Sequence, residues 1–131
     1  MIKTQQLQRH FKAGDSFVKA VDGLDLAISP GEFVAIMGPS GSGKSTLLYV
    51  LGAMDRPTAG QISIDGQRLD LMGDEQCSDF RNRQLGFVFQ SFHLLPRMNL
   101  VRNVELPMLY AQIPAERRRA REGGRYPSML R

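Results

Sequence analysis

Phe33-Val34-Ala35-Ile36-Met37 is followed directly by Gly38-Pro39-Ser40-Gly41-Ser42-Gly43-Lys44-Ser45. The first five residues form a continuous apolar run, which is typical of a strand buried on both faces of a parallel sheet. The next eight match a phosphate-binding pattern: glycine, any four residues, glycine, lysine, then serine or threonine. Apolar residues continue from Lys44 to about Ala53 and predict a helix. A strand, a glycine-rich loop and a helix in this order predict an α/β fold.

The residue types of the loop suit a ligand with dense negative charge. Glycines let the backbone curl so that successive N–H groups point at phosphate oxygens, and the helix adds its unpaired first-turn N–H groups. At 4 Å, the Lys44 charge contributes on the order of 4 kcal/mol before desolvation. Ser45 offers a hydroxyl to Mg²⁺, which prefers oxygen ligands. The sequence therefore predicts a P-loop NTPase-like core, whose nucleotide-binding residues are Gly38, Pro39, Ser40, Gly41, Ser42, Gly43, Lys44, Ser45 and Thr46.

The residues before the loop alternate between polar and apolar types, as exposed strands do. Strands are expected over residues 2–11, 17–21 and 24–28, with turns at residues 14–16 and 22–23. Short strands joined by such turns predict an N-terminal antiparallel β subdomain.

The residues after the loop predict further short elements. We expect an exposed strand over residues 61–65, a helix over residues 74–81 and a second buried strand over residues 85–89. A helix that contains Pro107 is expected over residues 99–111, and another should begin at Pro114.

Two residues outside the loop are candidates for the same site. Gln90 follows the second predicted buried strand, and ligands bind at the carboxyl ends of parallel strands. Its amide could hold both Mg²⁺ and an attacking water. Phe11 lies upstream and could stack on an adenine ring, although aromatic side chains also pack in cores.

These residues resemble the ATP-binding subunit of an ABC transporter, and the resemblance covers about residues 6–121. It implies that residues 38–45 are the Walker A motif, that Gln90 is the Q-loop glutamine and that Phe11 is the adenine-stacking aromatic of the A-loop. The sequences of residues 38–48, 82–96 and 103–111 are similar to those of the family branch that serves lipoprotein release and macrolide or antimicrobial-peptide export.

The resemblance also implies cofactors, partners and a location. ATP and Mg²⁺ are the expected cofactors, and Ser45 and Gln90 the expected metal ligands. The expected partners are a transmembrane permease subunit and a second nucleotide-binding subunit, with the chain at the inner face of the plasma membrane. Residues 91–105 resemble the surface that docks the permease, where Phe92, Leu94, Leu95 and Met98 would supply apolar contacts.

Composition agrees with a cytosolic protein that binds no nucleic acid. The net charge is +4, but 8 of the 17 basic residues against 3 of the 13 acidic ones fall in residues 97–131. The densest basic part, residues 116–121, has no interleaved aromatics for base stacking. No apolar run reaches the roughly 18 residues of a spanning helix. Cys77, His10 and His93 are too few to form a zinc site.

The chain departs from the family pattern after residue 121. The family's signature motif Leu-Ser-Gly-Gly-Gln, its Walker B strand and its later histidine do not occur, and Gly123-Gly124 lacks the flanking serine and glutamine. We therefore expect residues 1–121 to be the N-terminal part of a nucleotide-binding domain, truncated before those motifs, and residues 122–131 to be a divergent, disordered tail. Weak Mg²⁺-dependent nucleotide binding with little turnover is expected.

Three alternatives stay open at this point. A GTPase would need Asp-x-x-Gly after a strand; Asp70-Leu71-Met72-Gly73 fits, but polar Gln67 and Arg68 precede it and no Asn-Lys-x-Asp occurs. A small P-loop kinase and a remnant without function are the others.

Overall fold

The computed structural model describes residues 1–91 and 93–118, which fall into two compact units, Met1–Arg81 and Asn82–Arg131. The predicted tail over residues 122–131 lies outside the described residues.

Unit 1 is built on a long antiparallel hairpin, as the sequence predicted. Strands β1 (Ile2–Ala13) and β2 (Ser16–Ile28) pair from Ala13 with Ser16 to Ile2 with Ile28. The turn between them uses Gly14. The second turn expected at residues 22–23 is wrong, because β2 continues through both positions and the hairpin absorbs the irregular backbone as shifts in register.

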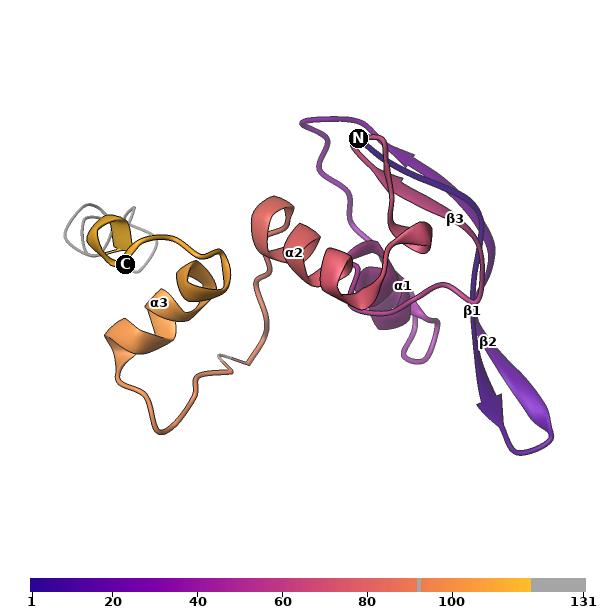
Figure 1. The fold of residues 1–131 in the computed structure, drawn as a ribbon. Coiled ribbons are helices and arrows are strands. Elements are labelled where there is room, and N and C mark those ends of the chain that lie inside the picture. Colours follow the sequence, from indigo (N-terminus) through magenta and orange to yellow (C-terminus); the bar gives the residue numbers. More distant parts are fainter. Residues whose placement is uncertain (92, 119–131) are drawn as a thin grey trace. The chain divides into compact units, whose positions relative to one another are not determined.

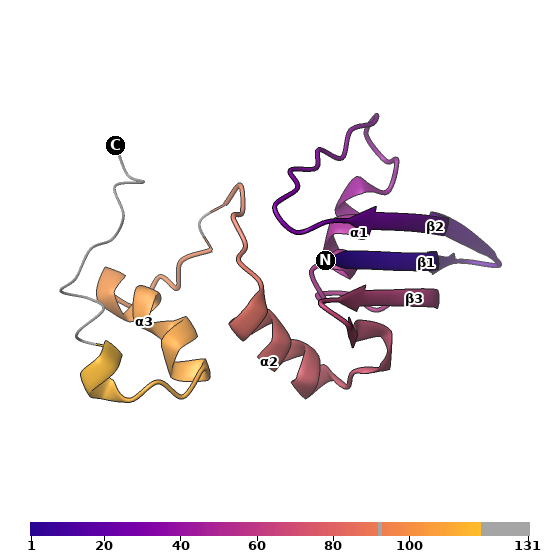
Figure 2. The same cartoon turned by 90° about the horizontal axis from the view of Figure 1, so that it is seen from above.

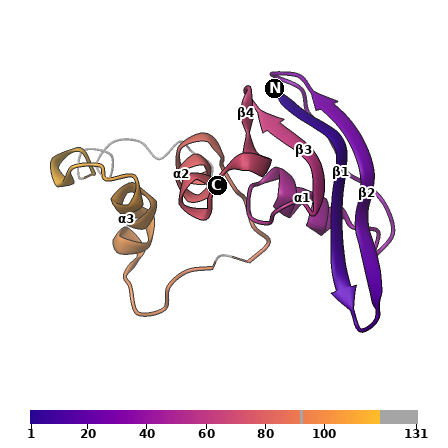
Figure 3. The same ribbon diagram turned by 45° about the vertical axis from the view of Figure 1, so that its right-hand side comes forward.

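Two further strands complete the sheet. β3 (Ala59–Ile64) pairs with β1, and the two-residue β4 (Gln67–Arg68) pairs with β3, which gives the order β2-β1-β3-β4. Figure 2 shows β1 between β2 and β3, and Figure 3 adds β4 at the edge. The strand predicted over residues 61–65 is confirmed. A short 3-10 helix, η1 (Leu69–Leu71), follows.

Helix α1 (Lys44–Leu51) and helix α2 (Asp74–Gln84) confirm the helices predicted there (Figure 1). The core of unit 1 is the layer between the sheet and these helices. Leu7, Ile62 and Val50 are almost fully buried in it. The other buried apolar side chains are Val21, Leu51, Ala53, Ile64, Leu69, Cys77 and Phe80. Apolar side chains from all of these elements therefore hold α1, the helix that follows the glycine-rich loop, against the sheet.

Unit 2 is organised by hydrogen bonds around helix α3 (Leu100–Tyr110). Asn99 caps the helix by accepting a hydrogen bond from the Arg102 amide at 2.9 Å. Pro107 lies inside the helix, and a further helical turn over residues 115–118 follows Pro114, so both predicted helices are confirmed. None of the described residues of this unit is buried.

The two predicted buried strands do not form in the structure. Residues 33–37 and 85–89 are irregular, and the side chains of Phe33 and Val88 are 94% and 102% exposed. The physical reason is that a strand needs a hydrogen-bonded neighbour, and neither segment pairs with another described segment. An apolar run signals burial in a sheet but supplies no partner by itself.

Candidate functional site

The glycine-rich loop is held by the close approach of β2. Gly43 precedes α1 with φ of 83°, and a Cβ atom at this position would lie 2.0 Å from the carbonyl oxygen of Ala20. Only glycine fits there. Gly43 accepts the first helical bond of α1 from the Leu47 amide at 2.8 Å. The N-terminus of α1 has no side-chain cap and no acidic residue in its first turn, so its N–H groups and its positive dipole end are available to an anion.

Lys44 folds back over the loop. Its Nζ donates hydrogen bonds to the carbonyl oxygens of Gly38 at 2.8 Å and Pro39 at 2.6 Å, and it lies 3.4 Å from Oγ of Ser42. Among the described residues, the ammonium group therefore contacts only neutral oxygens of the loop. A phosphate anion would interact with it more strongly than these carbonyl groups do.

One hollow joins the loop to the β1–β2 hairpin. Its volume is about 800 Å³. It is lined by Phe11, Val18, Lys19, Ala20, Ser40, Gly41, Ser42, Gly43, Lys44, Ser45 and Thr46. A second cavity of about 450 Å³ lies between the loop and residues 20–24 of β2, and Gly38 and Pro39 line it. Every residue predicted from the loop thus lines one of these two spaces.

Phe11 is the predicted residue that the fold brings to the loop. Its side chain is 39% exposed, so it is no core residue, and it lines the same hollow as Ser45 and Thr46. It pairs with Val18 across the hairpin. The guanidinium carbon of Arg9 lies 4.4 Å from the centroid of the Phe11 ring.

Charged side chains of β2 lie at both spaces, with Lys19 lining the hollow and Asp22 lining the second cavity. Asp22 accepts hydrogen bonds from Lys19 at 3.1 Å and pairs with Nε2 of His10 at 3.0 Å. The hydrogen bond from Lys19, followed by the one from His10, lowers the pKa of Asp22 below its usual value. Asp22 therefore stays ionised, and it balances the positive charge of Lys19 beside the loop.

Two further candidates, Gln90 and Asp70, are among the described residues. Gln90 belongs to unit 2, where it is exposed and follows the irregular residues 85–89. Asp70, the residue that a GTPase would need, instead accepts the Ile62 amide at 3.0 Å and pairs with Arg68. Its bonds serve the sheet edge, which removes the support for that alternative.

Sequence reasoning missed the contribution of β2. Val18, Lys19 and Ala20 line the hollow, yet they belong to no phosphate-binding pattern. The signal that could have found them is the hairpin itself, because a turn at Gly14 places Val18 opposite Phe11.

Apolar helices long enough to cross a bilayer do not occur in the part of the chain that the structure describes.

Comparisons with known proteins show the family to which the chain belongs. The ABC transporter family model matches residues 21–126. An uncharacterized ABC transporter ATP-binding protein of Thermotoga maritima is 50% identical over 111 residues, which are 85% of this chain and 47% of that protein. The macrolide export ATP-binding/permease protein MacB of Rhodopseudomonas palustris is 48% identical over 122 residues, 93% of this chain and 19% of that protein.

A solved structure gives the same assignment. The dimeric ATP-binding cassette MJ0796, in a post-hydrolysis state bound to ADP and Pi, superposes with a TM-score of 0.83 at 40% identity. The match covers 92% of this chain and 53% of that cassette, so the chain spans about half the length of the cassette-sized relatives it matches. On these matches and on the loop that opens α1, the chain belongs to the ABC transporter family, as part of its ATP-binding component.

Proposed function

We propose that this chain binds Mg²⁺-ATP in the hollow between the glycine-rich loop and the β1–β2 hairpin. The observation that carries the proposal is that Phe11 lines the same hollow as Lys44, Ser45 and Thr46. A nucleotide triphosphate has a flat aromatic end and a highly charged end, and this hollow offers an aromatic side chain and an ammonium group to match them.

The residues present fit such a ligand. Lys44 holds its charge over the loop on two neutral carbonyl oxygens, and the first-turn amides of α1 have no side-chain cap. Gly38 to Lys44 would hold the phosphates, and the hydroxyls of Ser45 and Thr46 would hold Mg²⁺ and phosphate. Gln90 is the second proposed metal ligand. Bound Mg²⁺ would supply charge neutralisation at the phosphate oxygens.

ATP binding would serve transport through a membrane partner. The relatives include a fused ATP-binding/permease protein for macrolide export and a cassette that is dimeric. By analogy, we assign this chain to the energising part of an export or lipoprotein-release system, at the inner face of the plasma membrane. A second nucleotide-binding subunit and a permease are its proposed partners. The exposed Leu94, Leu95 and Met98 are the proposed permease contacts. Phe92, the fourth residue expected there, lies outside the described residues.

Turnover by the chain as it stands is expected to be low. Hydrolysis needs a positioned water and stabilisation of charge in a closed site. The 131 residues contain no match to the segments that the family resemblance assigns to these tasks.

The test is a competition experiment with the purified 131-residue chain. A fluorescent ATP analogue is titrated with and without Mg²⁺, and it is then displaced by ATP or GTP. We expect Mg²⁺-dependent binding that ATP displaces. Stronger displacement by GTP would favour a guanine-specific protein, and absence of binding would favour a remnant without function. Co-purification with candidate permeases tests the proposed partner separately.

A further inference from the structure

The aromatic ring of Phe11 is backed by a cation. The Arg9 guanidinium lies over the ring at 4.4 Å from its centroid, and Arg9, although described, does not line the hollow that Phe11 lines. We infer that Arg9 is a positioning residue, which holds Phe11 as a platform for a purine base and is itself anchored by Asp55. This inference rests on the proposed function, because it concerns the base of the nucleotide whose phosphates the loop would bind.

Asp55 fixes the guanidinium. Nε of Arg9 donates a hydrogen bond to Oδ2 of Asp55 at 2.7 Å, and the two side chains are only 24% and 29% exposed. A free arginine side chain samples many rotamers, and a half-buried charged hydrogen bond removes most of that freedom. Asp55 therefore fixes the orientation of the Arg9 guanidinium above the Phe11 ring.

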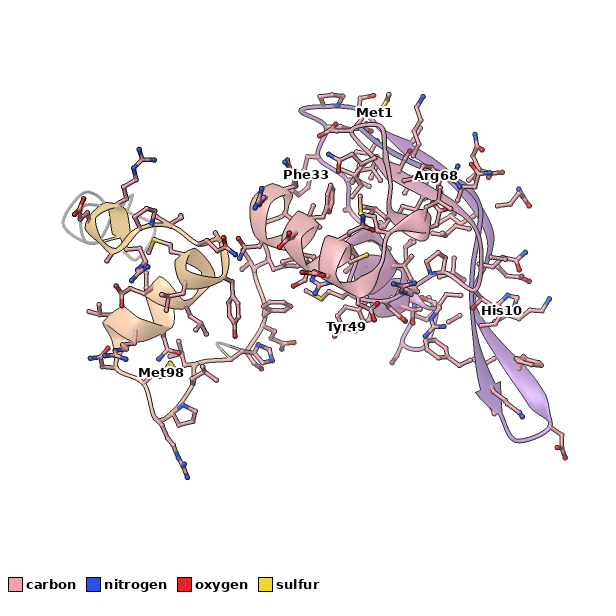
Figure 4. All side chains as sticks on the ribbon, viewed as in Figure 1. Met1, His10, Phe33, Tyr49, Arg68 and Met98 are labelled. Carbon is pink, nitrogen blue, oxygen red and sulfur yellow. The ribbon has the colours of Figure 1, made fainter. Side chains whose placement is uncertain are left out.

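Asp55 in turn is fixed to the helix that begins at the loop. Its amide donates to the carbonyl oxygen of Tyr49, in the last turns of α1, at 3.2 Å. Three residues later, Thr58 makes two hydrogen bonds to β1. Its amide donates to the Gln8 carbonyl oxygen at 2.7 Å, and its Oγ1 accepts a hydrogen bond from the His10 amide at 2.9 Å. Figure 4 shows His10 on β1 and Tyr49 on α1. One end of α1 thus carries Lys44, and the other end holds the strand that carries Phe11.

This arrangement assigns one ring face to each task. One face of the Phe11 ring contacts the Arg9 guanidinium. The opposite face would stack on a base bound in the hollow. Stacking tolerates any flat aromatic partner, and the larger surface of a purine favours it over a pyrimidine. Arg9 is therefore expected to affect affinity for the base and to leave affinity for the phosphates unchanged.

The experiment compares two ligands that share phosphates but differ in the base. The full chain and its variants are titrated with Mg²⁺-ATP and with Mg²⁺-tripolyphosphate by displacement of a fluorescent ATP analogue. In Arg9→Gln, we expect ATP affinity to fall about threefold to fivefold, the size of an exposed cation–π contact, with tripolyphosphate affinity unchanged. Asp55→Asn should shift ATP affinity in the same direction. Arg56→Gln is the matched control, because the Arg56 side chain pairs with Asp74, whereas the cation over the Phe11 ring is that of Arg9.

A double-mutant cycle tests whether the effect passes through the ring. In a Phe11→Leu background, Arg9→Gln should no longer change ATP affinity. If Arg9→Gln is too unstable to purify, Arg9→Lys keeps a charge for Asp55 but removes the flat stack, and it should weaken ATP by about twofold to threefold with tripolyphosphate unchanged.

Equal loss for ATP and tripolyphosphate, no change for either, or an undiminished Arg9→Gln effect in the Phe11→Leu background would each overturn the inference while leaving the proposed function intact. If the unaltered chain binds neither ligand, the proposed function fails, and the inference fails with it.

Discussion

The carbonyl oxygen of Ala20 on β2 lies 2.0 Å from the point where a Cβ atom on Gly43 would stand. The loop and the hairpin are therefore in contact at a position that accepts no side chain. We predict that Gly43→Ala forces β2 and the loop apart and removes nucleotide binding, with a loss of roughly 2–4 kcal/mol in the free energy of unfolding. Urea unfolding and ATP-analogue titration measure the two effects.

Gly41 provides the control for this prediction. It has φ of 80°, close to that of Gly43, but a Cβ atom there would meet nothing within 4 Å. Gly41→Ala should lower the free energy of unfolding by only about 1 kcal/mol, through backbone strain. Equal effects at the two positions would mean that strain, and not the contact with Ala20, explains the Gly43 result.

A second prediction concerns Lys44. Its ammonium group is bound to the carbonyl oxygens of Gly38 and Pro39, which an anion would outcompete. Lys44→Met should weaken both ATP and tripolyphosphate by about 100-fold, since roughly 3 kcal/mol of a direct charge interaction remains after desolvation. The measurement is displacement of the fluorescent analogue. Lys3→Met, on an exposed part of β1, removes the same charge away from the loop and should change neither affinity.

The local parts of this fold could be predicted from the sequence. The glycine pattern before Lys44, the turn at Gly14 and the apolar period of α1 are all short-range signals, and each led to the element observed. The strand predicted over residues 33–37 does not form. An apolar run indicates that burial would be favourable, but it does not identify a strand that could pair with it.

The candidate site divides in the same way. The loop residues follow from one contiguous pattern, whereas the environment of Phe11 depends on Asp55, which is 46 positions from Arg9 in sequence. No spacing rule connects those residues. Only the packing of the segment after α1 against β1 brings them together.

A third prediction concerns the loop between Gln90 and α3. The side-chain oxygen of Asn103 accepts the Leu95 amide at 2.7 Å, and its Nδ2 donates to the carbonyl oxygens of Met98 and Asn99 at 3.1 Å each. Asn103→Ala removes all of these bonds and should destabilise the loop by about 1–2 kcal/mol. Hydrogen exchange of the Leu95 amide should accelerate about tenfold.

Asn82 is a matched control in the same unit. Its Nδ2 donates a hydrogen bond to the Pro107 carbonyl at 3.0 Å. Asn82→Ala should leave exchange at Leu95 unchanged. Faster exchange at Leu95 in that variant would show that the loop responds to any loosening of unit 2, which would contradict a specific role for Asn103.

A fourth prediction links stability to pH through Asp70. The hydrogen bond from Arg68, with a further one from the Ile62 amide, lowers the pKa of Asp70 despite the opposing effect of burial. A lowered pKa in the folded state gives stability that is complete above the unfolded value of about 3.9 and is lost as pH falls through the folded value. Asp70→Asn should therefore be less stable than the unaltered chain by about 1–2 kcal/mol at pH 7, and the difference should shrink as pH drops below about 4.

Asp70→Ala separates the charge from the hydrogen bond. The asparagine keeps an oxygen for the Ile62 amide, whereas alanine leaves that N–H without its acceptor. Urea unfolding across pH should thus show Asp70→Asn converging with the unaltered chain in acid, while Asp70→Ala stays lower at every pH. If all three proteins kept the same spacing from pH 7 down to pH 3, the ionised carboxylate would contribute nothing. The ion pair with Arg68 would then add nothing measurable to the free energy of unfolding, and Asp70 would stabilise the sheet edge only through its hydrogen bond from the Ile62 amide.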